Sequence, residues 1–238
     1  MAAKDSTGRF FRVAECFLSI NGEARRAGEL SAFIRFTGCN LKCNYCDTSW
    51  ACDANAPYEL MTAEDIHNYI KELNVKNVTL TGGEPLLQPE FSALLLELLS
   101  DKRLRVEIET NGAVDITPLI NEVTTNLGKA AAERMSFTLD YKCPGSGMES
   151  FMNPKNFTAA RHVDTVKFVV SDERDLDKMS EVCAKYGLTD KLQVYVSAVF
   201  DRISPETIVG YMITHNLNDI RLQLQLHKYI WDPDKRGV

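Results

Sequence analysis

The feature that most constrains the fold is a repeated alternation of short β-branched runs with longer helical patterns. The candidate strands are residues 12–18, 31–38, 77–82, 105–112, 135–141, 164–170, 192–199 and 220–227. The candidate helices between them are residues 62–73, 89–102, 173–187 and 204–216. Apolar strands that alternate with helices predict a parallel sheet with helices packed outside it.

Capping residues support the helical patterns. Thr62, with Asp65 three residues on, is close to a capping box. Pro89 is expected in the first turn of its helix, and Ser204, followed by a proline, is expected as an N-cap. Gly187 is expected as a C-cap, because glycine readily adopts the left-handed conformation that ends helices.

About eight candidate strands in 238 residues suggest a barrel. A closed eightfold barrel typically needs about 250 residues, and an irregular segment near residues 39–52 uses part of this length. We therefore predict one α/β domain, residues 1–238, folded as a partial, open β/α barrel. A doubly wound sheet is the alternative, and both architectures place the active site at the C-terminal ends of the strands.

A group of cysteines directly follows the candidate strand 31–38. Cys39, Cys43 and Cys46 have C-x3-C-x2-C spacing, and such soft ligands favour zinc, copper(I) or an iron–sulfur cluster. A structural zinc site needs four ligands, so Cys52 or a histidine would have to supply the fourth. Three thiolates on a four-iron cluster would instead leave one iron open to a small molecule.

Composition narrows the possible environments and partners. The net charge of −6 and the pI near 5.3 argue against a duplex nucleic-acid binder. No apolar run approaches the roughly 20 residues of a membrane span, and the N-terminal residues contain no apolar core of a secretory signal. Seven cysteines, an odd number, do not form a complete disulfide framework. We therefore expect a cytoplasmic protein, where thiols stay reduced.

A second motif, G-G-E-P at residues 82–85, directly follows the candidate strand 77–82. Glycines let the backbone turn sharply and approach a ligand with bare amides. Glu84 offers a carboxylate to an ammonium group. Taken alone, the motif fits an ordinary turn equally well.

Together, the cysteine motif and G-G-E-P resemble the radical S-adenosylmethionine (SAM) family. This resemblance implies a [4Fe-4S] cluster on Cys39, Cys43 and Cys46, whose open iron binds the amino and carboxylate groups of SAM. One electron from the cluster would cleave SAM to a 5′-deoxyadenosyl radical. The resemblance implies SAM contacts at Tyr45, Asp47, Gly83, Glu84, Glu109, Asp140, Tyr141, Lys142 and Ser197.

Longer stretches, at residues 15–48, 80–88, 108–112 and 224–233, resemble the 7-carboxy-7-deazaguanine synthase family. The resemblance covers most of the chain. It implies a carbon–nitrogen lyase that converts 6-carboxy-5,6,7,8-tetrahydropterin to 7-carboxy-7-deazaguanine by radical ring contraction with loss of ammonia. This reaction belongs to the synthesis of 7-deazapurines such as queuosine, a tRNA modification.

The same resemblance implies substrate contacts at Ile20, Asn21, Gly22, Glu23, Arg35, Thr81, His227 and Pro233. Arg35 is expected to bind the substrate carboxylate, because a planar guanidinium can donate two parallel bonds. Thr48 is expected to bind Mg²⁺. The alternatives are a surface ion pair for Arg35, a loop cap for Thr48 and simple packing for His227. Glu107 shares a strand face with Glu109 by period two, and solvation of this carboxylate is an equal alternative.

The resemblance also implies the partners. They are a small-molecule pterin, an electron donor such as flavodoxin or ferredoxin, and a second copy in a homodimer, with no nucleic acid and no membrane. Two other functions fit part of the pattern. A radical SAM activase, acting on a glycine of a partner protein, shares the cysteine spacing. An electron carrier or iron–sulfur sensor usually needs four protein ligands and leaves G-G-E-P unexplained.

Overall fold

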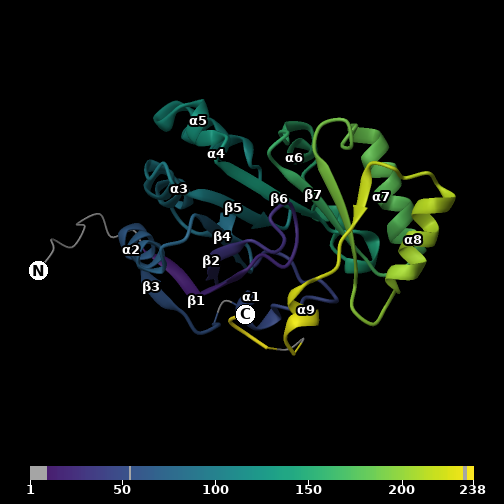
Figure 1. The fold of residues 1–238 in the computed structure, drawn as a ribbon, viewed down its shortest axis with the longest axis horizontal. Helices are drawn as coiled ribbons and strands as arrows, with labels where there is room; N and C mark the ends of the chain where they lie inside the picture. The colour runs from purple at the N-terminus through teal and green to yellow at the C-terminus, as the bar shows by residue number, and fades with distance from the viewer. Residues whose placement is uncertain (1–9, 54, 233–234) are drawn as a thin grey trace, which may run out of the picture.

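The computed structural model describes residues 10–53, 55–232 and 235–238. In this part of the chain one sheet of nine strands has the order β3-β1-β2-β4-β5-β6-β7-β8-β9 (Figure 1). The strands are β1 (Phe11–Ile20), β2 (Leu30–Phe36), β3 (Glu59–Met61), β4 (Asn77–Gly82), β5 (Arg105–Thr110), β6 (Met135–Tyr141), β7 (Thr165–Val170), β8 (Gln193–Ala198) and β9 (Ile220–Leu222).

The strand order makes the sheet an open barrel. β2 pairs in parallel with β4, and parallel pairing continues strand by strand to β9. β1 is antiparallel to both β2 and β3. The edge strands β3 and β9 are not paired with each other, so the sheet stays open. The predicted partial barrel is therefore confirmed, and the doubly wound alternative is wrong because neighbouring parallel strands follow one another in sequence.

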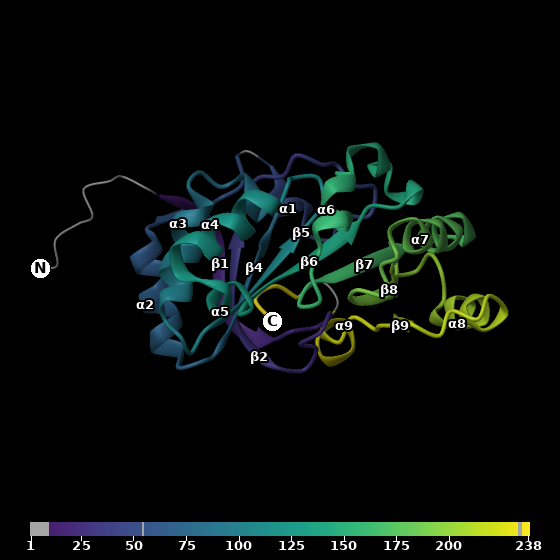
Figure 2. The same ribbon diagram turned by 90° about the horizontal axis from the view of Figure 1, so that it is seen from above.

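The helices that connect the strands are α2 (Ala63–Leu73), α3 (Phe91–Ser100), α4 (Thr117–Leu127), α5 (Lys129–Ala132), α6 (Pro154–Ala159), α7 (Glu173–Tyr186) and α8 (Pro205–Thr214). Two further short helices are α1 (Ser49–Cys52) and α9 (His227–Ile230). Figures 1 and 2 show α2 to α8 along the outer side of the curved sheet, with α9 and the C-terminus on the other side. None of the described helices has the length and apolar character that crossing a membrane requires.

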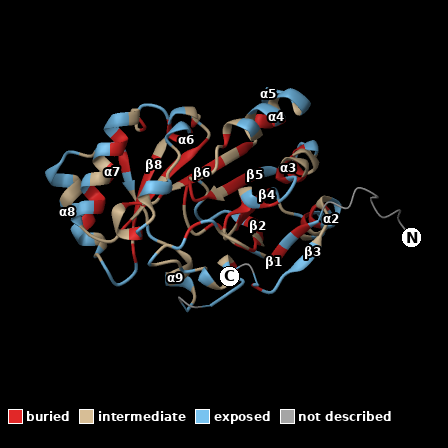
Figure 3. Ribbon diagram, turned by 180° about the vertical axis from the view of Figure 1, so that it is seen from behind, coloured by how far each residue is buried: buried red, intermediate tan, exposed pale blue. Residues whose placement is uncertain are grey.

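Alternation along the strands gives the sheet two unlike faces. In β5, Val106 and Ile108 are fully buried against the helices, whereas Glu107 and Glu109 face the other way. Figure 3 shows the buried residues along the strands and the exposed residues on the outer helices. We call the second face the inner face; it carries Ser31, Phe33, Arg35, Thr79, Thr81, Glu107, Glu109, Thr138, Asp140, Lys167, Tyr195 and Ser197.

Most predicted helix ends are confirmed. Thr62 forms a complete capping box with Asp65, Ser204 accepts a bond from a first-turn amide of α8, and Gly187 ends α7 with φ of 56°. The predicted position of Pro89 in the first turn of its helix is wrong. α3 begins only at Phe91, because the intervening residue adopts a left-handed conformation and serves as the N-cap.

Candidate active site

The cysteine loop, residues 37–48, crosses the C-terminal ends of distant strands. It leaves β2 and lies against the segments that follow β6 and β7. The Tyr45 hydroxyl donates to the Val169 carbonyl of β7 at 3.1 Å. The Asn44 amide donates to the Ser146 carbonyl, also at 3.1 Å. These bonds hold the three motif cysteines at the edge of the sheet where the sequence predicted the active site.

The thiols of the loop fit a metal–sulfur group by their chemistry. Cys39, Cys43 and Cys46 are free and half-buried. Hydrogen bonding with the Cys52 thiol, 3.8 Å from Cys46 Sγ, lowers the pKa of Cys39 and Cys46 to about 6 although burial acts the other way. Burial raises the pKa of Cys43. A lowered pKa favours the thiolate, the form that binds metal.

The described His, Cys, Asp and Glu side chains include no group of three arranged to hold a single metal ion. A four-iron cluster differs from a single-ion site because each of its thiolates binds a different iron. The three soft ligands on one loop therefore fit such a cluster by number and type.

The glycines of G-G-E-P allow the turn after β4 to contact the cysteine loop. A Cβ atom at Gly83 would collide with the Gly38 carbonyl oxygen. The Gly83 amide donates to the Phe36 carbonyl at 3.1 Å, and the Glu84 amide donates to Gly38 at 2.8 Å. The expectation that these amides are offered bare to a ligand is thus wrong. β2 and β4 are parallel neighbours, so their exits lie close enough to bond to each other.

Glu84 connects the turns after two neighbouring strands. Its fully buried carboxylate accepts hydrogen bonds from the Thr110 hydroxyl at 2.8 Å, the Asn111 amide at 2.7 Å and the Leu86 amide at 3.1 Å. Burial raises the pKa of Glu84 to about 7, although these bonds oppose the change. The carboxylate therefore already has protein donors, and its predicted contact with SAM stays a prediction.

Two predicted site residues of the inner face are bonded to each other, and a third is paired elsewhere. The Thr81 hydroxyl donates to Glu109 Oε2 at 2.6 Å. Arg35 Nε donates to Glu15 Oε1 at 2.8 Å, across the antiparallel pair of β1 and β2. The Arg35 side chain is 16% exposed, so this ion pair is not the surface pair considered from sequence. Glu15 had no distinguishing signal in the sequence, because only strand pairing places it beside Arg35.

Glu23 joins the turn after β1 to the far side of the barrel. Its carboxylate accepts from Lys167 Nζ at 2.9 Å, Ser197 Oγ at 3.0 Å and Gln225 Nε2 at 3.4 Å. Burial alone would raise the pKa of Glu23, but the Lys167 ammonium and these bonds hold it below its usual range. Lys167 was not among the predicted site residues, and its signal in the sequence is a lysine inside an otherwise apolar strand.

The C-terminal segment covers the turn after β1. A Cβ atom at Gly22 would lie 2.6 Å from His227 Nδ1, and the Leu226 amide donates to the Gly22 carbonyl at 3.1 Å. Burial lowers the pKa of His227, which favours a neutral imidazole. The structure thus brings His227 to the turn that begins at Ile20, the last residue of β1. Pro233 lies outside the described residues.

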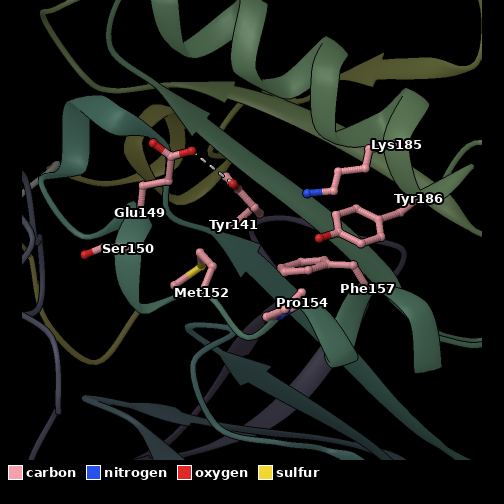
Figure 4. A pocket seen from close by; sticks show the side chains of 8 residues that line it. All are labelled: Tyr141, Glu149, Ser150, Met152, Pro154, Phe157, Lys185 and Tyr186. Carbon is pink, nitrogen blue, oxygen red and sulfur yellow. Dashed lines mark hydrogen bonds between the residues drawn. The ribbon is translucent and has the colours of Figure 1, made fainter.

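The residues at the end of β6 and directly after it point to both faces of the sheet. Lys142 Nζ lies 2.8 Å from Asp140 Oδ2 on the inner face. Tyr141 points outward, since neighbouring strand residues alternate, and its hydroxyl donates to Glu149 at 3.3 Å. Figure 4 shows Tyr141 and Phe157 among the residues that line one cavity, whose volume is about 340 Å³. The Tyr141 side chain therefore points away from the inner face, and the predicted place of Tyr141 in a turn that contacts SAM stays a prediction.

Thr48 lies beside the cluster ligands and does not cap a helix through its side chain. It occupies the N-cap position of α1 without a side-chain capping bond. Its hydroxyl lies 3.8 Å from Cys46 Sγ and 3.5 Å from Asp47 Oδ1. Both contacts lie within the cysteine loop, so the loop-cap alternative and the magnesium role both stay predictions.

Several buried polar atoms of this region have no hydrogen-bond partner among the described residues. They are Ser19 Oγ, Asn21 Nδ2, Glu107 Oε2 and Asp140 Oδ1. Buried polar groups are nearly always paired in native proteins. An unpaired set on one face, below a loop of thiols, therefore indicates a site for a polar ligand.

Proteins of known family resemble this chain in sequence. A model of the radical SAM superfamily matches residues 33–141. The 7-carboxy-7-deazaguanine synthase of Clostridium acetobutylicum is 52% identical over 228 residues, covering 96% of this chain and 99% of that protein. The synthase of Chlorobaculum tepidum is 34% identical over 98% of this chain and 100% of its own length.

The fold has a counterpart among solved structures. The crystal structure of QueE from Escherichia coli matches with a TM-score of 0.67 at 20% identity, covering 93% of this chain and 99% of that one. At this identity the match supports the fold alone. The similarity in sequence, which extends over nearly the whole length of both relatives, shows that the chain belongs to the 7-carboxy-7-deazaguanine synthase family of the radical SAM superfamily.

Proposed function

We propose that the protein converts 6-carboxy-5,6,7,8-tetrahydropterin to 7-carboxy-7-deazaguanine, with loss of ammonia, in the pathway to queuosine and tRNA modification. The observation that carries this proposal is the position of the cysteine loop directly above an inner face with unpaired buried polar atoms. Membership of the synthase family supports the choice of substrate.

The thiols of Cys39, Cys43 and Cys46 would hold a [4Fe-4S] cluster, next to which SAM binds. With both bound, this pair supplies the one-electron chemistry that removes a hydrogen atom from the substrate. The Gly83 and Glu84 turn holds the cysteine loop in place through backbone bonds. Tyr45 fixes the loop to β7, so the reacting centre is held at the C-terminal edge of the sheet.

The inner face would bind and orient the pterin. Arg35, held at Nε by Glu15, would bind the substrate carboxylate through its other nitrogens. Glu109 would contact SAM through its second oxygen, because the Thr81 hydroxyl bonds to only one of the two. The segment with His227 would exclude water from one side.

The remaining details follow from the family resemblance. Thr48 would bind Mg²⁺, a hard ion that usually keeps waters and takes oxygens from the substrate. Asp47, Asp140, Lys142 and Ser197 would lie near SAM. We further propose a single domain over residues 1–238, a homodimer, an electron donor such as flavodoxin or ferredoxin, and a cytoplasmic location.

Anaerobic reconstitution tests the function. The reconstituted protein is incubated with SAM, a reductant and the carboxypterin, and the products are identified by mass. We expect 7-carboxy-7-deazaguanine and ammonia. Cys46→Ala should lose both the cluster and the product, whereas Cys183→Ala, a buried cysteine of α7, is the matched control. Failure of the iron-loaded protein to convert the pterin would contradict the proposal.

A further inference from the structure

Glu107 is a buried carboxylate with one oxygen that accepts no hydrogen bond from the described residues, although it lies within ion-pair distance of Arg26. It is 4% exposed, and its Oε1 accepts a bond from the Thr138 hydroxyl at 2.6 Å. Its Oε2 is buried and has no hydrogen-bond partner in the described part of the chain. Arg26 Nε lies 3.9 Å away, which is too far for a hydrogen bond.

Asn21, in the turn after β1, presents the complementary atom and is bonded to the strand beside Glu107. The Thr79 hydroxyl donates to Asn21 Oδ1 at 2.8 Å, and Asn21 Nδ2 is a buried donor without a hydrogen-bond partner among the described residues. Thr79 is the register partner of Glu107 in the neighbouring parallel strand. Among the described residues, the unpaired donor therefore belongs to a side chain that is bonded to the strand next to the unpaired acceptor, and the two atoms are not bonded to each other.

The positions of these residues along the strands indicate which edge of a bound pterin ring would lie beside Glu107 and Asn21. Arg35, Thr81 and Glu109 form an upper row beside the cysteine loop, where the substrate carboxylate and the reacting carbon belong. Thr79 and Glu107 are two residues lower, about 6–7 Å further from the loop. A bicyclic ring whose carboxylate lies at the upper row would point its opposite edge toward Glu107 and Asn21.

We propose that Glu107 is a specificity-determining residue that accepts hydrogen bonds from the amino-substituted edge of the pterin ring, while Asn21 donates to the adjacent ring carbonyl. That edge carries an exocyclic amino group and a ring N–H beside a carbonyl oxygen, the complement of a carboxylate next to an amide donor. This inference rests on the proposed function and adds to it the residues that distinguish a 2-amino ring from a 2-oxo ring.

The test compares the affinities for two ligands. Anaerobic calorimetry on the cluster- and SAM-loaded protein measures binding of the carboxylated tetrahydropterin and of its counterpart with a 2-oxo group. The wild type should prefer the 2-amino ring by about ten- to a hundredfold, because the 2-oxo group would face the carboxylate with an acceptor. Glu107→Gln should reduce this preference to less than about threefold, since an amide can turn either atom to the ring.

Two variants keep the test specific. Arg26→Met removes the nearby cation and should retain the preference, and Glu64→Gln, on the exposed surface of α2, should behave as the wild type. An unchanged preference in Glu107→Gln would overturn the inference while leaving the function intact. An equal loss of the preference for the 2-amino ring in Arg26→Met would also overturn the inference, because it would assign the preference to the Arg26–Glu107 ion pair. If the wild type binds neither ring, the proposed function fails and the inference fails with it.

Discussion

Individual charged residues of the inner face are held by specific partners. Glu15 fixes Arg35 through Nε alone, and Thr81 fixes one oxygen of Glu109. Each contact occupies only part of the functional group. The remaining nitrogens and oxygen keep a defined orientation toward a ligand, which lowers the conformational entropy lost on binding.

Arg35→Lys should weaken binding of the carboxypterin by roughly ten- to over a hundredfold, because an ammonium cannot donate two parallel bonds to a carboxylate. Anaerobic calorimetry in the presence of SAM measures this. Arg25→Lys, an exposed arginine of the same region, serves as the control. Equal affinities of wild type and Arg35→Lys would place Arg35 outside the binding site.

Thr48→Ala should keep the cluster and SAM binding but lose the stimulation of turnover by Mg²⁺, because it removes a hard oxygen ligand without removing a bond that caps helix α1. Turnover is measured against Mg²⁺ concentration, with iron content as a check on the cluster. Ser49→Ala, at the next and exposed position, is the matched control. A mutant that still responds fully to Mg²⁺ would exclude the assignment.

At the scale of elements, buried bonds align the turns that carry the site. The Glu84 carboxylate joins the turn after β4 to Thr110 and Asn111 at the end of β5. The backbone of the same turn bonds to the cysteine loop after β2. These bonds therefore join the segments that follow β2, β4 and β5 into one rigid edge of the sheet.

The raised pKa of Glu84 predicts a pH dependence of stability. The folded state holds the proton up to about pH 7, whereas an unfolded glutamate releases it near pH 4.5. The folded protein thus binds more protons in this window, and its free energy of unfolding falls as pH rises. Relative to Glu84→Gln, the wild type should lose about 2–3 kcal/mol between about pH 5 and pH 8.

Urea unfolding of both proteins across this range measures the difference. Glu72→Gln, an exposed carboxylate on α2, provides the reference slope. A difference that does not change with pH would mean that the three donors keep Glu84 ionised in the folded state.

At the scale of the whole molecule, Glu23 bridges the gap that the open barrel leaves. Lys167 and Ser197 reach it from β7 and β8, and Gln225 reaches it from the C-terminal segment. Because β3 and β9 do not pair, these side-chain bonds connect the turn after β1 to the opposite side of the sheet.

Lys167→Met should destabilise the fold by about 3–5 kcal/mol, since it leaves the buried Glu23 carboxylate without its cation. Adding Glu23→Gln should restore much of this loss, because the double variant removes both charges of the pair and leaves neither one buried without the other. Chemical unfolding of both single variants and the double variant gives the coupling energy. Additive losses would show that the two residues do not act as a pair.

The sequence was sufficient for the features that follow from local patterns. Short β-branched runs identified eight of the strands, helix caps supported four of the helices, and strand–helix order predicted the open barrel. The three residues of β3, and α4 to α6, were not predicted. The predicted strand 220–227 forms β9 only over Ile220–Leu222. Beyond this strand, the side chains of Gln223 and Gln225 bond to Ala24 and Glu23 in the turn after β1.

The spacing of the three cysteines identified the motif, and its position directly after a β-branched run placed it after a strand. The period of a strand tells which face a side chain occupies, but it does not tell which residue lies opposite. Lys167 and Glu23 are separated by 144 positions, and the tertiary structure alone pairs them. Long-range neighbours decide whether a buried polar group is paired. For this reason only the fold shows that Glu84 has three hydrogen-bond donors, and that Glu107 and Asn21 each have an atom without a hydrogen-bond partner among the described residues.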